Sequence, residues 1–379
     1  MNKRVTNVFL TSLCLAIIVG CGNDNKESQI SSSLSSSDAA IDTSSNTQII
    51  TSSNEDKTTE NTKIEVPEGM YLSELTGEPI DDSLKDQRPI AVMIDNEYDS
   101  LPHYGTTEAD IVYELINSTN QDRITRLMCI IKDWGDIQKL GNIRSAQPTN
   151  IMLAAEYNAV LCHEDGPWYN EFYYQLYSSD HFSGVFSHVD TSNRLLYETF
   201  ILAGDLDKAF SDSNITPTYS DTYYESGDKL CFTDYGTVVD LEGQVSAVTE
   251  VALPFYHNSS MLKYNEATEK YEYYEYGSIY QDAEYSNSLA FDNVILQNTR
   301  IYNIDDNGYL EYDFNSSLEV CNYYLTRGKC IPIYWKSDNN SIVHYYTDAD
   351  FTKELEMNTG KTYIALVPSD TWDEVSLNN

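Results

Sequence analysis

Residues 88–96 read Arg-Pro-Ile-Ala-Val-Met-Ile-Asp-Asn, an unbroken apolar run between a proline and two polar residues. A strand with one face exposed to solvent would alternate apolar and polar side chains. An unbroken apolar run of this length is typical of a strand that is buried on both faces. Residues 90–94 are therefore predicted to form a central strand, and the rest of the fold is built outward from it.

Further stretches of the same kind follow along the chain. Residues 110–116 and 124–131 are mostly apolar and of strand length, and the polar segment 117–122 between them predicts a hairpin. Residues 159–162 form another short apolar stretch, which ends at His163. The first part of the globular chain is therefore expected to contain several strands of one sheet.

One helix is indicated between these strands. It is expected to begin at Pro148, with Thr149 or Asn150 as its cap and with apolar residues at helical spacing after it. Residues 164–234 are aromatic and show neither the helical nor the strand period clearly, so no element is predicted there.

Beyond Val245 the pattern is almost entirely that of strands. Asp306-Asn307-Gly308 predicts a tight turn, and a two-residue turn at Arg327-Gly328 would place Cys330 opposite Leu325. Strands are expected within 289–304, 309–314, 330–335, 342–346 and 362–367. Because helix signals are scarce here, a small antiparallel β domain is predicted.

The cysteines do not form a disulfide pattern. Of the seven, Cys14 and Cys21 lie in the leader, and the other five show no CxxC motif and no regular spacing. With the turn at 327–328, Cys321 would face Tyr334 and not Cys330. Mostly buried free thiols are therefore expected.

The first twenty-one residues resemble a bacterial lipoprotein signal. A short basic head precedes an apolar run over 8–19, and the segment closes on Ile-Val-Gly-Cys at 18–21. The run is too short for a bilayer-spanning helix, which needs roughly 20 residues. Residues 1–20 are thus predicted to be a signal peptide and Cys21 the acylated new N-terminus; an ordinary cleaved secretory signal is the alternative.

Residues 21–63 are predicted to be a disordered tether. The segment is rich in Ser and Thr and has no aromatic residue, so it cannot bury enough surface to offset the entropy of ordering. A flexible coil of this length has an end-to-end distance of roughly 35 Å. The globular part, from about residue 64, would then stay close to a membrane surface.

The formal net charge of the chain is −37. This charge argues against nucleic acid and against anionic lipid as general partners, and it allows basic partners, divalent cations or neutral glycans. The ordinary alternative is that the charge only keeps an exported protein soluble.

Several segments together resemble a known family. In the first half these are 88–96, 109–114, 124–127 and 141–146, followed by His163. In the second half, 293–296, 328–335 and 360–364 continue the likeness. In this order and spacing they resemble the DUF3048, or YerB-like, lipoproteins of Gram-positive bacteria, and the likeness runs from about residue 86 to 368.

The resemblance implies an α+β fold. It implies a layered β/β/α sandwich-like N-terminal domain over 64–248 and a smaller antiparallel β-rich C-terminal domain over 249–372, with no cofactor and no assigned enzymatic activity. The chain departs from the family pattern at Gln147, Tyr273 and Tyr280, which replace basic residues, and at His103, which replaces a glutamine. The loss of positive groups argues against a ligand bound in the same way throughout the family.

Polar residues at the strand ends are candidates for ligand binding. They are Asp95, Asn96, Asp110, Glu114, Arg123, Arg126, Arg144, Ser145 and His163. Arg126 and Arg144 carry forked donors that suit a carboxylate or phosphate, and Asp110 and Glu114 could hold these arginines or coordinate a cation. The alternative is a buried ion-pair network that sets the register of the strands.

No catalytic residue and no metal site is predicted. The sequence has no HxxxH or HExxH around His163 and no GxSxG or SxxK around Ser145. The chain is nevertheless rich in tyrosine, with 31 residues that cluster within 169–177 and 271–276. Such clusters can form aromatic platforms for sugars or peptides, or they can simply be strand residues.

These observations predict a lipoprotein held at the outer face of the cell membrane of a Gram-positive bacterium, through the bilayer and acylated Cys21. Its expected role is a non-catalytic binding module for a wall glycan, a peptide or an envelope protein. One alternative is a hydrolase or transferase of wall polymers that would use Asp110, Glu114, Arg144 and His163. Another is a cation-dependent scaffold.

Overall fold

The computed structural model describes residues 64–191, 198–221, 223, 229–239, 241, 245–315, 322–339 and 341–379. The leader, Cys21 and the Ser/Thr-rich segment lie outside these residues, as does Cys321. Residues 61–379 form one compact unit. Strands far outnumber helices in the described part of the chain, which confirms the prediction of a β-rich fold with few helices.

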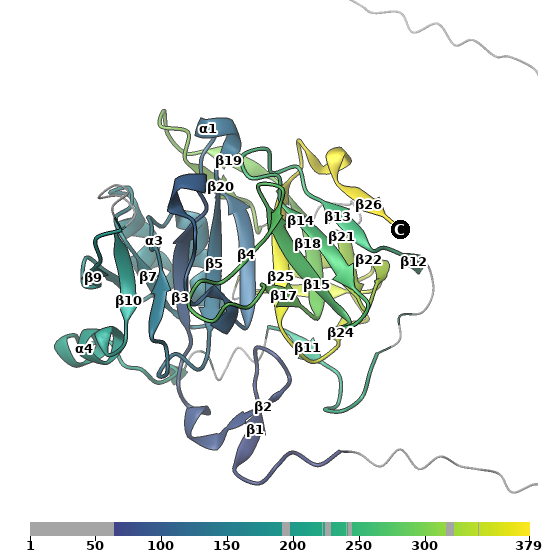
Figure 1. The fold of residues 1–379 in the computed structure, drawn as a ribbon, viewed down its shortest axis with the longest axis horizontal. Coiled ribbons are helices and arrows are strands. Elements are labelled where there is room, and N and C mark those ends of the chain that lie inside the picture. The colour runs from purple at the N-terminus through teal and green to yellow at the C-terminus, as the bar shows by residue number, and fades with distance from the viewer. Residues whose placement is uncertain are drawn as a thin grey trace, which may run out of the picture. The chain divides into compact units, whose positions relative to one another are not determined.

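An 11-stranded sheet runs through this unit (Figure 1). The predicted central strand is β3, and the predicted hairpin of β4 and β5 pairs antiparallel. In order, the sheet contains β12 (Ser246–Ala247), β22 (Lys329–Ser337), β21 (Asn322–Thr326), β18 (Asn293–Thr299), β25 (Thr362–Pro368), β4 (Ile111–Ile116), β5 (Thr125–Ile131), β3 (Ile90–Asp95), β7 (Val160–His163) and β8 (His181–Ser183), with β23 (Val343–Tyr346) beside β22.

Strand β25 joins the two halves of the chain. It pairs parallel with β4 on one side and parallel with β18 on the other. The expectation of a purely antiparallel C-terminal part is therefore wrong. A parallel pair is made by a long crossover and not by a hairpin, so no local turn signal announces it. The predicted domain boundary at 248/249 stays a prediction, and the large sheet takes strands from both sides of it.

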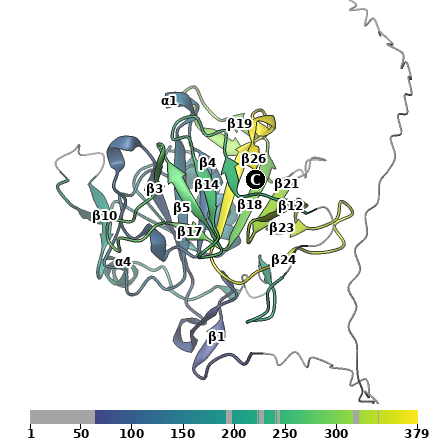
Figure 2. The same cartoon turned by 45° about the vertical axis from the view of Figure 1, so that its right-hand side comes forward.

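A six-stranded sheet packs on one face of the large sheet. It contains β16 (Ser278–Ile279), β15 (Lys270–Glu275), β14 (Met261–Asn265), β13 (Glu250–Ala252) and β26 (Ser376–Asn378), with β17 (Ala290–Phe291) beside β15. Its inward side chains, such as Leu262 and Tyr273, share a core with Val112 and Ile94. Strand β14 overlaps the large sheet in both views of Figures 1 and 2.

Helix α2 (Pro148–Glu156) covers the other face, where Ile151 and Leu153 pack with Met93 and Ile364. The helix begins as predicted at the proline, but its cap was predicted wrongly. Asn150 is the third helical residue, and its Oδ1 accepts a hydrogen bond from the backbone N–H of Gln147 at 2.7 Å. A side chain inside the first turn thus satisfies a donor in front of the helix.

The other elements are short. The helices are α1 (Asn120–Arg123), α3 (Asn170–Tyr177) and α4 (Asp205–Asp212), with 3-10 turns η1 (Asp82–Leu84), η2 (Tyr98–Ser100), η3 (Thr106–Glu108) and η5 (Trp372–Glu374). Small sheets pair β1 (Met70–Leu72) with β2 (Pro79–Asp81), β6 (Lys139–Gly141) with β10 (Thr199–Leu202) and β9 (Ser187–His188), β11 (Cys231–Phe232) with β24 (Glu356–Met357), and β19 (Ile301–Asn303) with β20 (Leu310–Tyr312).

The structure confirms the predicted turn between β21 and β22 and the register of the strands that it joins. Arg327 and Gly328 both have positive φ, and Cys330 lies opposite Leu325 as expected. The four described cysteines form no disulfide with one another; three are buried, and Cys231 is half-buried. Every helix within the described residues is too short or too polar to cross a lipid bilayer.

Candidate functional site

The predicted site residues fall into separate groups. Asp95 is the last residue of β3, and its direct cross-strand partner on β5 is Arg126. The two Asp95 oxygens bind Arg126 Nη1 at 3.1 Å and Arg144 Nε at 2.9 Å. Asp95 and Arg126 are both buried, and Ser145 beside Arg144 is half-buried. This arrangement resembles the structural alternative, an ion-pair network that holds the register of two strands.

A second group surrounds Glu114 on β4, which lies fully buried between the two sheets. Its oxygens accept hydrogen bonds from Ser260 Oγ at 2.6 Å, Asn258 Nδ2 at 2.8 Å and the Tyr363 hydroxyl at 2.5 Å. Asn96 Nδ2 reaches the same carboxylate at 3.4 Å. Burial raises the pKa of Glu114, and the hydrogen bonds oppose that rise.

Another member of this second group has no signal in the sequence. Glu275 on β15 is buried, and neither of its carboxylate oxygens has a hydrogen-bond partner among the described residues. Burial, and then the charge of Glu114, raise its pKa to about 8. Nearby, the Tyr280 hydroxyl lies 2.9 Å from His103 Nδ1, and the Tyr273 ring packs on that of Tyr280. His103, Tyr273 and Tyr280, three of the positions expected to depart from the family pattern, are thus linked by contacts in the seam between the two sheets.

Two candidates have local partners elsewhere. Asp110 Oδ2 accepts a hydrogen bond from the Lys132 backbone N–H at 2.7 Å, and burial raises the pKa of Asp110 to about 6. Arg123 binds Asp370 near the surface, with Nη1 donating to Oδ1 at 2.9 Å. Neither residue contacts the groups around Asp95 and Glu114 in the interactions described.

His163 is a buried and satisfied histidine. Its Nδ1 lies 2.8 Å from the Asp165 carbonyl oxygen, which can only accept, so Nδ1 carries the hydrogen. Its Nε2 is then left to accept from the Tyr174 hydroxyl at 2.8 Å and from His181 Nδ1 at 3.0 Å. Burial lowers the pKa of His163 to about 4, which keeps the ring neutral at pH 7.

The side chains of the four residues named for a hydrolase have different partners in the interactions described. Asp110, Glu114, Arg144 and His163 occur in four different sets of contacts among the described residues. The described residues also contain no cluster of three or more His, Cys, Asp or Glu side chains arranged to hold a metal ion. The remaining candidates for a binding site are the cavities at the surface of the protein.

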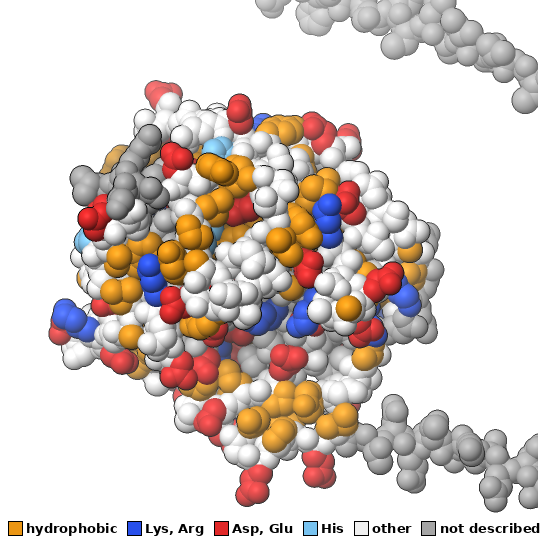
Figure 3. All heavy atoms as spheres, viewed as in Figure 1, with side chains coloured by type: hydrophobic (Ala, Val, Ile, Leu, Met, Phe, Trp, Pro, Cys, Tyr) orange, Lys and Arg blue, Asp and Glu red, His pale blue; other side chains and the backbone are white. Residues whose placement is uncertain are grey.

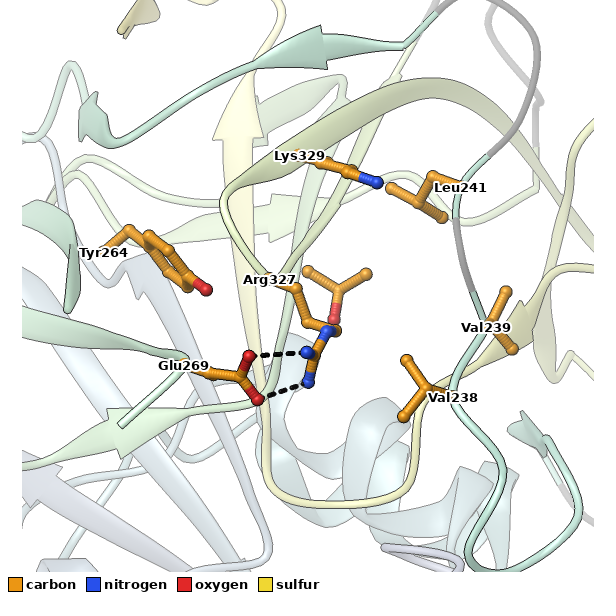
Figure 4. A pocket seen from close by; sticks show the side chains of 8 residues that line it. Val238, Val239, Leu241, Tyr264, Glu269, Arg327 and Lys329 are labelled. Carbon is orange, nitrogen blue, oxygen red and sulfur yellow. Dashed lines mark hydrogen bonds and ion pairs between the residues drawn. The ribbon is translucent and has the colours of Figure 1, made fainter. Parts of the chain in front are cut away.

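One cavity, of about 440 Å³, lies beside the β21–β22 turn (Figure 4). The Arg327 guanidinium points at Glu269 and binds it through two hydrogen bonds of 2.6 and 2.5 Å, while Val238 and Val239 line the opposite wall. Two of the three charged side chains that line this cavity, Arg327 and Glu269, are therefore paired with each other, and Lys329 is the third.

A second cavity, of about 540 Å³, lies beside helices α2 and α3 and is called the α3 cavity below. Its two charged walls are internally paired. Arg88 Nη1 binds Asp180 at 2.6 Å, and Glu156 binds the buried Lys229. The remaining lining is apolar or carries uncharged hydroxyl and amide groups: Met152, Ala155, Asn158, Leu176, Tyr177, Ser178, Thr216, Ser220, Tyr223, Asn339, Ser341 and Ile342.

An exposed apolar stripe leads to this cavity. Trp168, Phe172 and Leu176 are 88%, 62% and 57% exposed, and Leu176 also lines the cavity. Phe172 and Leu176 are four residues apart and lie on one face of α3, and Trp168 lies in the turn before that helix. We call these three residues the α3 ridge. The sequence analysis considered only the tyrosines of this segment as a binding surface and not these three apolar residues. Of those tyrosines, Tyr174 is buried and Tyr173 binds Glu311.

Comparison with known proteins places the chain in a family. A family model described as "Protein of unknown function (DUF3048) N-terminal domain" matches residues 75–216, and the corresponding C-terminal model matches residues 251–364. The chain is 24% identical over 310 residues to "Putative lipoprotein YerB" of Bacillus subtilis (strain 168), covering 78% of this chain and 85% of that protein.

The fold is similar as well. The crystal structure of the YerB protein from Bacillus subtilis matches with a TM-score of 0.67 and 21% identity, over 82% of this chain and all of that chain. The resemblance predicted from the sequence is confirmed, and the two model matches in their expected order show that the chain belongs to the DUF3048 family.

Proposed function

We propose that this protein is a lipid-anchored extracytoplasmic module that binds an uncharged wall glycan at the α3 cavity. The anchor is supported by the Ile-Val-Gly-Cys sequence at 18–21 and by the relative's name as a lipoprotein. The expected location is the outer face of the cell membrane of a Gram-positive bacterium. The acidic side chains that spread over the face in Figure 3 suit an uncharged or basic partner better than an anionic polymer.

The main support for the proposal is that the α3 ridge adjoins the α3 cavity, whose charged side chains already form ion pairs within the protein. Exposed aromatic rings provide flat apolar faces that suit the faces of sugar rings. Ser178, Ser220 and Asn158 provide hydroxyl and amide groups that suit sugar hydroxyls. A charged ligand would have to compete with the Arg88–Asp180 and Lys229–Glu156 pairs, whereas a neutral one would not.

Binding without catalysis agrees with the state of the predicted polar residues. Asp95, Arg126 and Glu114 are buried and engaged with protein groups, and His163 is held neutral. No second function is favoured by a specific contact.

The test is recovery of the full chain with purified peptidoglycan. The double variant Trp168→Ala/Phe172→Ala removes the ridge, and Ala155→Trp fills the cavity from α2. We expect the double variant to reduce affinity by about tenfold or more, the loss typical of truncating aromatic binding residues. Ala155→Trp should also reduce affinity, because the new ring occupies the space of the ligand. Tyr302→Ala, at an exposed tyrosine on β19, is the matched control and should bind like the wild type.

Equal recovery with and without wall material would contradict glycan binding. The anchor is tested separately by growth with a palmitate analogue, which should label the wild type and not Cys21→Ser. An unlabelled wild-type protein in the cytosol would contradict the anchoring part of the proposal.

A further inference from the structure

Two buried carboxyl groups, Glu114 and Glu275, lie in the seam between the two sheets, close enough for the charge of one to raise the pKa of the other, and are called the seam pair. The register of β14 and β15 sets Met261 opposite Tyr274, so Ser260 comes opposite Glu275 one position further on. Opposed residues of neighbouring strands have Cβ atoms about 5 Å apart. Ser260 Oγ in turn lies 2.6 Å from Glu114 Oε1, so one serine adjoins both carboxyl groups.

The shortest hydrogen bonds of the seam, of 2.5 to 2.8 Å, go to one member of the pair. Ser260, Asn258 and Tyr363 donate to Glu114, whereas neither oxygen of Glu275 has a donor at hydrogen-bond distance among the described residues. Asn258 and Tyr273 interact with Glu275 too weakly to cancel the effect of burial, so its pKa stays raised. An ionised carboxylate can only accept hydrogen bonds, and burying it without donors or a counter-ion is strongly unfavourable. The distribution of donors thus marks Glu114 as the ionised member and Glu275 as the neutral one.

The seam also offers an acceptor for a proton on Glu275. The Asn258 side chain interacts with both carboxyl groups: its Nδ2 donates to Glu114, and its effect on Glu275 is to lower the pKa of that group, against the larger effect of burial. Its Oδ1 is buried and has no partner among the described residues. A protonated Glu275 that donates to this oxygen would satisfy two orphaned groups with one hydrogen bond.

We propose that the seam pair holds one proton at neutral pH, carried by Glu275, and that loss of this proton in alkaline solution weakens the contact between the two sheets. The other groups that face Glu275 are uncharged or negative. Tyr273 comes from its own strand, Tyr276 from the turn after that strand, Tyr280 from beyond the turn, and Glu114 and Tyr363 from the large sheet. A bound cation is the less favourable occupant, because Ca²⁺ takes six to eight oxygen ligands and the Glu114 oxygens already accept from three donors.

The direction of the effect follows from linkage. Glu275 keeps its proton up to a pKa of about 8 in the folded chain, whereas an unfolded glutamate loses it near pH 4.3. Between these values the folded state binds more protons than the unfolded state. The folding equilibrium therefore loses up to about tenfold for each pH unit of increase across this window, and it levels off above it.

Urea unfolding of the full chain between pH 5 and 9 tests this inference. Glu275→Gln imitates the neutral acid, so its unfolding constant should fall relative to the wild type by about a hundredfold or more between pH 5 and pH 8. Glu266→Gln is the matched control, because it removes an exposed carboxylate from the turn of the same hairpin. It should follow the wild type at every pH.

A ratio of the Glu275→Gln and wild-type unfolding constants that does not change with pH would overturn the proposal. A measurement on the wild type alone provides a second check: an infrared difference spectrum between pH 7 and pH 9.5 should show loss of the carbonyl band of a protonated carboxylic acid. No such band, or a melting temperature that CaCl₂ raises in the wild type but not in Glu275→Gln, would show that the pair holds a cation and not a proton.

Discussion

At the scale of single residues, buried charge in this protein depends on its immediate partners. Asp95 is fully buried and binds two arginines, one of them also buried. Asp95→Asn keeps the shape of the side chain but leaves Arg126 without its counter-charge. We expect a loss of about 3–5 kcal/mol of unfolding free energy, the usual result of breaking a buried ion pair from one side, measured by urea denaturation at pH 7.

Asp370→Asn is the matched control, because it breaks the exposed Arg123–Asp370 pair. Pairs in water contribute about 0–1 kcal/mol, so this variant should unfold nearly like the wild type. Similar losses for the two variants would show that the Asp95 network adds no more stability than a surface pair.

The sequence could identify Asp95 and Arg126 because both stand at the ends of apolar runs. It could not identify Asn258, Ser260 and Glu275 as partners of Glu114. These residues are more than a hundred positions away along the chain, and only the packing of two sheets brings them together. Sequence patterns relate residues that are close along the chain and carry no information about such long-range contacts. The group of residues around Glu114 was therefore not predicted.

At the scale of elements, the β21–β22 turn illustrates how backbone and packing act together. Gly328 has φ +72, and a Cβ there would meet the Tyr264 ring at 2.9 Å. We expect Gly328→Ala to destabilise the fold by about 1–2 kcal/mol, through a strained left-handed backbone and a crowded ring. Thermal and urea unfolding measure the effect.

Gly277→Ala separates the two contributions. Gly277 has φ +76, but a Cβ added there would have no atom within 4 Å, so only backbone strain is added. The loss at Gly328 should exceed the loss at Gly277, and Tyr264→Ala should reduce the difference. Equal losses at both glycines would show that the contact with the tyrosine has no effect on stability.

Strands and turns could be predicted where a single local feature of the sequence, such as an apolar run or a turn motif, determines the element. The unbroken apolar runs became β3, β4 and β5, and the Asp-Asn-Gly turn joins β19 to β20. Residues 289–304 were expected to hold one or two strands and contain β17, β18 and β19, because partners in three different sheets divide them. Helix α3 was missed because it exposes apolar residues, which removes the usual amphipathic pattern.

At the scale of the whole molecule, the large sheet depends on a strand from near the C-terminus. Strand β25 is fully buried between β4 and β18 and pairs with residues more than 240 positions earlier along the chain. The N-terminal family model ends before residue 248, and the C-terminal model begins after it. Neither part alone contains all the central strands of the large sheet. The predicted two domains are thus expected to be parts of one cooperative unit.

Separate production of residues 64–248 and 249–379 tests this expectation. Without β25, strand β4 becomes an edge whose buried side chains, such as Val112 and Leu115, lose their neighbours Tyr363 and Leu366. We expect neither fragment to show a cooperative melt by circular dichroism, and an equimolar mixture to recover one. The matched control is the intact 64–379 chain cleaved at a protease site inserted after residue 248, which should stay associated. A dispersed NMR spectrum and a cooperative melt for 64–248 alone would instead establish an independent N-terminal domain, because its core would then be complete without the C-terminal strand.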